Sequence, residues 1–134
     1  MTMNYDMIEA YPRQLARSAN WKLFIEAKYR LMQYWRESKQ VNHQTRRAFI
    51  EILCIQIFTE DLYNLEETCQ KFCREFGGNP YEHDEYSIMV DLKEAIEKKD
   101  WESATEVTRK PIFGFLEIEV VRPLRKWLSE QKPV

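Results

Sequence analysis

A recurring junction between a polar and an apolar residue divides this chain into segments of nearly equal length. Asn or Asp stands directly before a large apolar residue at three places, Asn20-Trp21, Asp61-Leu62 and Asp100-Trp101. The steps between them, 61 − 20 = 41 and 100 − 61 = 39 residues, match the length of a two-helix repeat unit. Asn and Asp side chains accept hydrogen bonds from the free N–H groups of a helix's first turn. Each junction therefore predicts the start of a new helix pair, and stacked pairs must share one apolar core.

The spacing of apolar residues predicts where the helices lie. Helices are expected over residues 20–38, 44–59, 61–76, 82–98, 100–109 and 112–121. The second of these is apolar nearly all round after residue 48, so we expect it at the centre of the core. Pro12 is expected to break a short opening helix over residues 7–16, or to leave it partly frayed. Pro123 is expected to kink or end the sixth helix before a last amphipathic turn.

Together these features predict an all-α protein, built as a right-handed α-solenoid of about three tetratricopeptide-like helix pairs. The chain has 134 residues, enough for one domain that buries a core without disulfides or metal. Within a single domain, 1–134, we expect an N-terminal segment (1–17), the helix pairs (18–128) and a flexible tail (129–134). Gly77-Gly78 is expected to close a helix and not to form a phosphate-binding loop.

The first strong helix carries a second apolar stripe beside its main one. Leu23, Ala27 and Tyr34 form this stripe at helical spacing. Something must cover it, because an exposed apolar patch favours association. Three candidates remain open: the 7–16 segment folding back, another copy of the chain, or a preceding repeat. Self-association through the first helix is thus one expectation.

Composition and charge exclude several function classes. Lys plus Arg number 20 against 22 Asp plus Glu, so the basic excess typical of a nucleic-acid binder is missing and no nucleic-acid partner is expected. No apolar run approaches the roughly 20 residues of a membrane span, and the first residues lack the pattern of a secretory signal. We therefore expect no membrane span and a cytoplasmic location, with peripheral attachment to membranes left open.

The residues that could carry chemistry do not assemble into a catalytic or metal motif. Cys69 and Cys73 have metal-compatible spacing, but zinc needs four ligands and Cys54 lies in the most apolar segment. A nucleophilic pair of Cys73 with His83 would need oxyanion donors that no loop motif supplies. We expect buried, reduced thiols, no catalytic residue, no cofactor and no metal. A small enzyme using a buried thiol is the least favoured alternative.

Several segments resemble a known family of helical adaptors. They are Arg47-Ala48-Phe49-Ile50-Glu51-Ile52-Leu53-Cys54, Asp61-Leu62-Tyr63-Asn64-Leu65-Glu66-Glu67-Thr68-Cys69, the stretch 92–104 that contains Lys98-Lys99-Asp100-Trp101, and Lys110-Pro111-Ile112-Phe113-Gly114-Phe115-Leu116. Over residues 24–128 the chain resembles the C-terminal half of the soluble NSF attachment proteins (SNAPs), in particular their gamma branch. The resemblance implies a tetratricopeptide-like α-solenoid without catalytic residues that couples SNARE helical bundles to the hexameric ATPase NSF.

The resemblance and the charge pattern each suggest residues that contact a partner. In SNAPs, acidic residues at the end of a late helix face basic residues of NSF, and the matching residues here are Glu94 and Glu97. Arg122, Arg125 and Lys126 form a small basic cluster, which fits either a solvated surface or a docking site for an acidic partner. The function we expect is that of a SNAP-like, non-catalytic adaptor in vesicle trafficking and protein transport. The alternative is a generic helical-repeat scaffold subunit of a larger complex, such as a 40-kDa huntingtin-associated protein-like partner.

Overall fold

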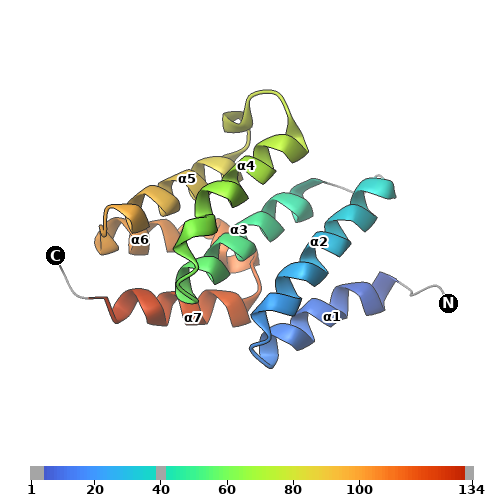
Figure 1. Ribbon diagram of the computed structural model, residues 1–134, viewed down its shortest axis with the longest axis horizontal. Helices are drawn as coiled ribbons and strands as arrows, with labels where there is room; N and C mark the ends of the chain where they lie inside the picture. Colours follow the sequence, from blue (N-terminus) through green and yellow to red (C-terminus); the bar gives the residue numbers. More distant parts are fainter. Residues whose placement is uncertain (1–4, 39–41, 132–134) are drawn as a thin grey trace.

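A computed structural model of the chain describes residues 5–38 and 42–131, and every regular element in these ranges is a helix. This confirms the all-α class. The α-helices are α1 (Tyr5–Arg17), α2 (Trp21–Glu37), α3 (Asn42–Phe58), α4 (Leu65–Phe76), α5 (Asp84–Glu97), α6 (Trp101–Thr108) and α7 (Ile118–Ser129) (Figure 1). Three short 3₁₀ helices join them, namely η1 (Leu62–Asn64), η2 (Pro80–Glu82) and η3 (Pro111–Phe115).

Each of the three junctions in the sequence is a turn that ends one helix shortly before the next begins. The residue before the polar one has a positive φ angle, 56° at Ala19, 61° at Glu60 and 57° at Lys99. The polar residue donates its N–H to the carbonyl five residues earlier, with N···O distances of 2.9 Å at Asn20, 2.7 Å at Asp61 and 2.8 Å at Asp100. The residue before it donates to the carbonyl three residues earlier, so each turn is a Schellman motif without the usual glycine. The turns connect helices that pack on each other: α1 on α2, α3 on α4 and α5 on α6.

The expected capping role of the junction residues is correct at one position and wrong at two. Asp100 accepts a hydrogen bond from the Ser103 N–H at 3.1 Å. Asn20 makes no side-chain capping bond, and the Asp61 carboxylate instead accepts from the Asn64 side chain at 2.8 Å. The Schellman turn thus accounts for all three junctions, whereas side-chain capping accounts for one.

Helix α3 is the centre of the core, as predicted. It contacts α2, α4, α5 and α7, and it runs through the middle of the molecule in Figure 1. Ile50, Ile52, Leu53 and Cys54 on this helix are fully buried. Such all-round burial requires neighbours on every side, which these four helices provide.

Helix α1 covers one side of α2 and continues through Pro12, so the predicted break is wrong. Leu15 and Ala16 join the buried core, and α1 contacts both α2 and α7. The Pro12 side chain is itself buried, so packing offsets the helical hydrogen bond that proline removes. Helix α1, the opening segment among the three candidate covers, packs against α2, and the other two candidates stay untested. Ala27 is buried, whereas Leu23 remains 39% exposed.

The predicted sixth helix over residues 112–121 is also wrong. Pro111–Phe115 form η3, the backbone at Leu116 and Glu117 is extended, and α7 then runs through Pro123. The Glu51 carboxylate of α3 accepts the Glu117 N–H at 2.7 Å, which fixes this irregular junction. The apolar side chains of α7 stay buried on both sides of Pro123, namely Val120, Val121, Leu124 and Leu128.

The last helix, α7, extends one residue beyond the predicted end of the helix pairs at residue 128. Ser129, the first residue of the predicted flexible tail (129–134), belongs to α7. Residues 132–134 of that predicted tail and residues 1–4 of the opening segment lie outside the described residues. Helix α7 packs against α3 and α1 as well as α6. Contacts therefore reach beyond consecutive pairs, and the solenoid arrangement with its handedness stays a prediction.

Candidate functional site

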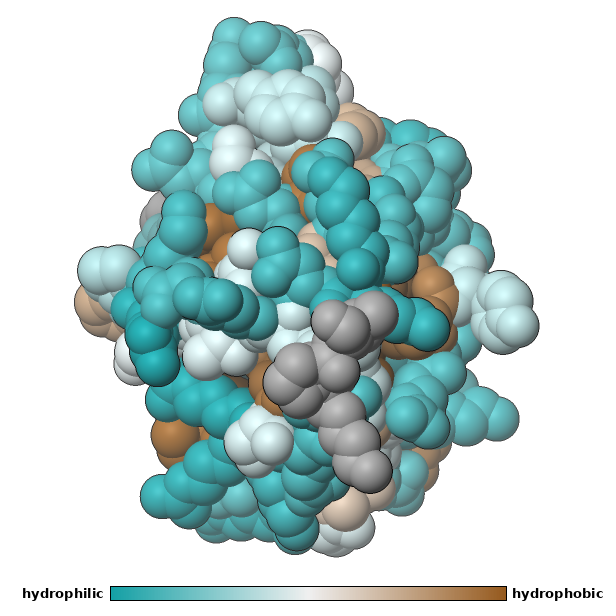
Figure 2. Space-filling model, turned by 90° about the vertical axis from the view of Figure 1, so that its left-hand side faces the viewer, coloured by the Kyte–Doolittle hydropathy of each residue, from teal (hydrophilic) through white to brown (hydrophobic). Residues whose placement is uncertain are grey.

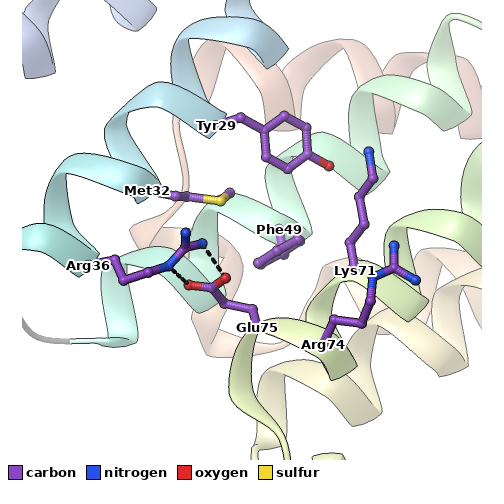
Figure 3. Close-up of a pocket in the computed structure, with 7 residues that line it drawn as sticks. All are labelled: Tyr29, Met32, Arg36, Phe49, Lys71, Arg74 and Glu75. Atoms are coloured by element: carbon purple, nitrogen blue, oxygen red, sulfur yellow. Dashed lines mark hydrogen bonds and ion pairs between the residues drawn. The ribbon is translucent and has the colours of Figure 1, made fainter.

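A groove of about 640 Å³ opens between α2 and α4, with α3 below it. Figure 3 shows its lining, which consists of Tyr29, Met32, Arg36, Phe49, Lys71, Arg74 and Glu75. The first three residues belong to α2, Phe49 to α3 and the last three to α4. The groove therefore exists only because three separate helices pack side by side.

The floor of the groove is apolar and belongs to the buried core. Met32 and Phe49 are each 2% exposed, so they belong to the core and only their outer surfaces reach the groove. The Phe49 ring lies edge-on to Tyr29, at 6.2 Å between centroids, and to Phe72, at 5.4 Å. Aromatic contacts of this geometry add to packing and hold the rings in place.

The walls of the groove are mainly basic. Arg36 and Glu75 form a two-pronged ion pair across it, with Nε 3.0 Å from Oε1 (Figure 3). The Lys71 ammonium lies 4.8 Å from the centroid of the Tyr29 ring, a cation–π contact, and 3.9 Å from Oε1 of Glu67 on the same helix. The lining thus carries three cations and one carboxylate.

The Tyr29 hydroxyl stays protonated in this setting. Burial, and then the negative charge of Glu67, raises the pKa of Tyr29 to about 12. Its O–H group is therefore a neutral donor and acceptor at the edge of the groove, and the charge there comes from the Lys and Arg side chains.

Two of the three thiols have raised pKa values because they are buried. Burial raises the pKa of Cys69 to about 12, and burial together with the nearby Glu51 charge raises the pKa of Cys54 even further. Cys73 is half-buried, so the expectation that all three thiols are buried is wrong at this position. His83, its suggested partner, packs its ring against Phe76 at 5.2 Å. In the part of the chain that is described, no cluster of three or more His, Cys, Asp or Glu could hold a metal ion.

The acidic residues suggested by the resemblance lie on α5, outside the groove. The Glu97 carboxylate is 3.1 Å from the Lys93 ammonium, which also bridges to Glu66 on α4 at 3.0 Å. Glu94 is exposed and lines a shallow depression of about 300 Å³ with Asp91 and Asp100. Glu94 is therefore accessible to a partner, whereas Glu97 is already paired with Lys93.

The three residues of the predicted basic cluster, all on α7, do not have the same contacts. Arg125 donates from Nη2 to the Thr108 carbonyl at 2.9 Å and so satisfies a free C=O group at the end of α6. Arg122 and Lys126 are exposed. The face of the molecule at the left of Figure 1, where α6 and the end of α7 lie, is covered mostly by hydrophilic side chains (Figure 2).

Sequence reasoning missed the cations of the groove. Lys71 and Arg74 lie on the polar side of α4, which in sequence is indistinguishable from a solvated helix face. Arg36 is 35 residues earlier than Lys71, counted as 71 − 36. Only the packing of α2 beside α4 brings them together, so no local signal could have found them.

No protein-family model matches the chain, and neither a curated protein nor a solved structure matches it. The resemblance to SNAPs therefore stays a prediction that rests on the motifs quoted above. No described helix combines the length and the apolarity that crossing a bilayer requires.

Proposed function

We propose that the protein is a non-catalytic, protein-binding adaptor whose α2–α4 groove receives an acidic segment of its partner. The observation that carries this proposal is the excess of cations over carboxylates in the lining of a groove with an apolar floor. Arg36 is paired with Glu75 and Lys71 lies 3.9 Å from Glu67 Oε1 on the same exposed helix face, whereas the ion pairs among the described residues do not include Arg74. An apolar floor with a basic rim fits a segment that presents apolar side chains flanked by carboxylates.

The charges of the groove set the expected behaviour of this interaction. Exposed ion pairs contribute roughly 0.2–1 kcal/mol each, so the charges of the groove chiefly direct the partner to it. Such pairs are screened by salt because they lie at the surface. Binding should therefore weaken as the ionic strength rises.

The test is binding of a fluorescent amphipathic peptide rich in Glu and Leu, followed by anisotropy at low and high salt. We expect the double substitution Lys71→Glu and Arg74→Glu to weaken binding by about tenfold or more. The matched control is Arg122→Glu with Lys126→Glu on α7, which changes the net charge equally. Equal losses in both variants would mean that net charge alone attracts the peptide, and the groove proposal would then fail.

A more specific form of this proposal is a SNAP-like role that couples SNARE-type proteins to the NSF ATPase in vesicle trafficking. It rests on the resemblance, and it places the protein in the cytoplasm, with peripheral attachment to membranes. A coupling adaptor needs two binding surfaces, and the basic groove and the acidic depression around Glu94 share no lining residue. Affinity purification scored for NSF and SNAREs tests this role, because a different large partner would contradict it.

The alternative is a scaffold subunit of a larger complex, of the 40-kDa huntingtin-associated protein type. Large exposed side chains favour this alternative, since Tyr63 is 98% and Phe115 is 68% exposed. A stoichiometric complex that survives high salt and withstands the α4 double substitution would support the scaffold role over the groove-based adaptor.

A further inference from the structure

A second pocket, of about 440 Å³, lies where α1, α2 and α3 meet the junction between η3 and α7. It shares no lining residue with the α2–α4 groove. Its charged lining consists of three cations, Arg13, Lys28 and Arg47, and two carboxylates, Glu51 and Glu117. Counted together these side chains leave one positive charge, 3 − 2 = 1.

Both carboxylates are already engaged with groups of the protein. Glu51 is 4% exposed; its Oε1 is 2.9 Å from the Lys28 ammonium and its Oε2 accepts the Glu117 N–H at 2.7 Å. The Glu117 side chain accepts from Arg13 Nε at 3.0 Å. Both carboxylates are therefore already paired with cations other than Arg47.

Arg47 is the remaining cation of the lining. Its Nε–H group is buried and finds no acceptor within the described ranges. Its guanidinium lies 4.8 Å from the ring of Phe115, which is 68% exposed. The adjacent Arg46 differs, because its Nε is 3.0 Å from Glu85 Oε1 on α5. A buried donor without an acceptor loses its hydrogen bond to water and gains none in return, so an acceptor from a ligand would be favoured here.

We infer that this pocket binds a side-chain carboxylate of a partner protein, with Arg47 as its ion-pair partner. The single excess charge matches one monoanionic carboxylate, whereas a dianionic phosphate would exceed it. Phe115 holds the guanidinium on one face, which leaves its N–H edge for planar hydrogen bonding to a carboxylate. Ile118, also exposed, lies at the same pocket and offers a contact for an apolar side chain next to the carboxylate.

This site goes beyond the proposed function, because it stands whether or not the α2–α4 groove binds a ligand. Two blocked peptides serve as probes, acetyl-Leu-Glu-Leu-amide and its Gln counterpart, together with inorganic phosphate. The readout is the NMR signal of the Arg47 Nε–H group during titration. We expect a saturable shift with the Glu peptide and an affinity at least about tenfold lower for the Gln peptide.

Variants separate the pocket from the rest of the surface. Arg47→Gln should reduce the affinity for the Glu peptide about tenfold, as followed by backbone amide shifts, while Arg122→Gln should leave it unchanged. Phe115→Ala provides a second test should Arg47→Gln fail to fold, since Phe115 is largely exposed. Lys71→Glu with Arg74→Glu should leave this peptide's affinity unaltered, which distinguishes the pocket from the groove.

Four outcomes would overturn the inference. The first is the absence of a saturable shift with the Glu peptide, and the second is equal binding of the Gln peptide. The third is a shift caused by inorganic phosphate at the same concentration as the peptide. The fourth is full affinity for the Glu peptide in Phe115→Ala and also in Arg47→Gln, where the latter folds. The phosphate outcome would identify a site for free anions and not for a protein side chain.

Discussion

Asp100 differs from the other junction residues because its side chain bonds to the backbone of the helix it precedes. It accepts from the Ser103 hydroxyl at 2.6 Å and from the Ser103 N–H at 3.1 Å, whereas Asn20 makes no side-chain capping bond. We therefore expect Asp100→Ala to lower the free energy of unfolding more than Asn20→Ala does, measured by urea unfolding at neutral pH. Equal losses would mean that the Schellman turn alone determines where these helices begin.

The same capping interaction predicts a pH dependence. The hydrogen bonds from the Ser103 hydroxyl and then from its N–H lower the pKa of Asp100 from the ordinary 3.8. A lowered folded-state pKa means that the contribution to stability is complete above that ordinary value and is lost as the pH falls through the lower folded value. The stability difference between the wild-type protein and Asp100→Ala should therefore shrink in this acidic range. A difference that stays constant with pH would contradict it.

Glu60 occupies a backbone conformation that costs residues other than glycine free energy. Its φ angle is 61°, and a left-handed conformation costs about 1–2 kcal/mol for a residue with a Cβ atom. Replacing Glu60 by glycine would remove this cost, but the greater freedom of glycine in the unfolded chain offsets about half of the stability gained. Glu60→Gly should thus raise the free energy of unfolding by about 0.5–1 kcal/mol, measured by urea unfolding.

Glu26, exposed inside α2, provides the matched control for this substitution. Glu26→Gly should lower the free energy of unfolding by about 1 kcal/mol, because glycine is unfavourable within a helix. The two Glu→Gly changes should therefore have opposite signs. Destabilisation in both would indicate that the left-handed turn carries no strain.

Among the helices, those with clear apolar periodicity could be predicted from the sequence. The core helix α3 and the end of α4 before Gly77 follow from local patterns, and the structure confirms both. The errors lie where distant residues determine the backbone. The junction of η3 with α7 depends on Glu51, which precedes Glu117 by 66 residues, and no local pattern contains that information. The same holds for the groove, since its cations meet only when α2 lies beside α4.

The contact between α6 and α7 leads to a prediction about the basic cluster. Arg125 donates to the Thr108 carbonyl, while Arg122 is exposed on the same helix. Arg125→Ala should lower the free energy of unfolding by about 1 kcal/mol, because a partly buried carbonyl loses its donor. Arg122→Ala should change it by less than about 0.5 kcal/mol. Thermal and urea unfolding check both, and equal effects would show that Arg125 belongs with the solvated surface.

At the scale of the whole molecule, the helices share a single hydrophobic core cluster. Helix α1 contributes Leu15 and Ala16 to it and touches both α2 and α7, the neighbouring helix in sequence and the last one. Helix α1 thus connects the first helix pair with the last helix, α7, and both pack on the core around α3. This arrangement makes α1 both a cover for α2 and a link to α7.

Deleting residues 1–17 tests this role of α1 directly. The deletion should expose the side of α2 that α1 covers, together with the part of α7 that α1 contacts. Because large exposed apolar patches favour association, we expect a lower melting temperature and a concentration-dependent increase in sedimentation coefficient. Deletion of residues 1–4 alone, which retains all of α1, is the control and should change neither. A 1–17 deletion that stays monomeric and melts at the wild-type temperature would show that α1 is not the cover that α2 requires.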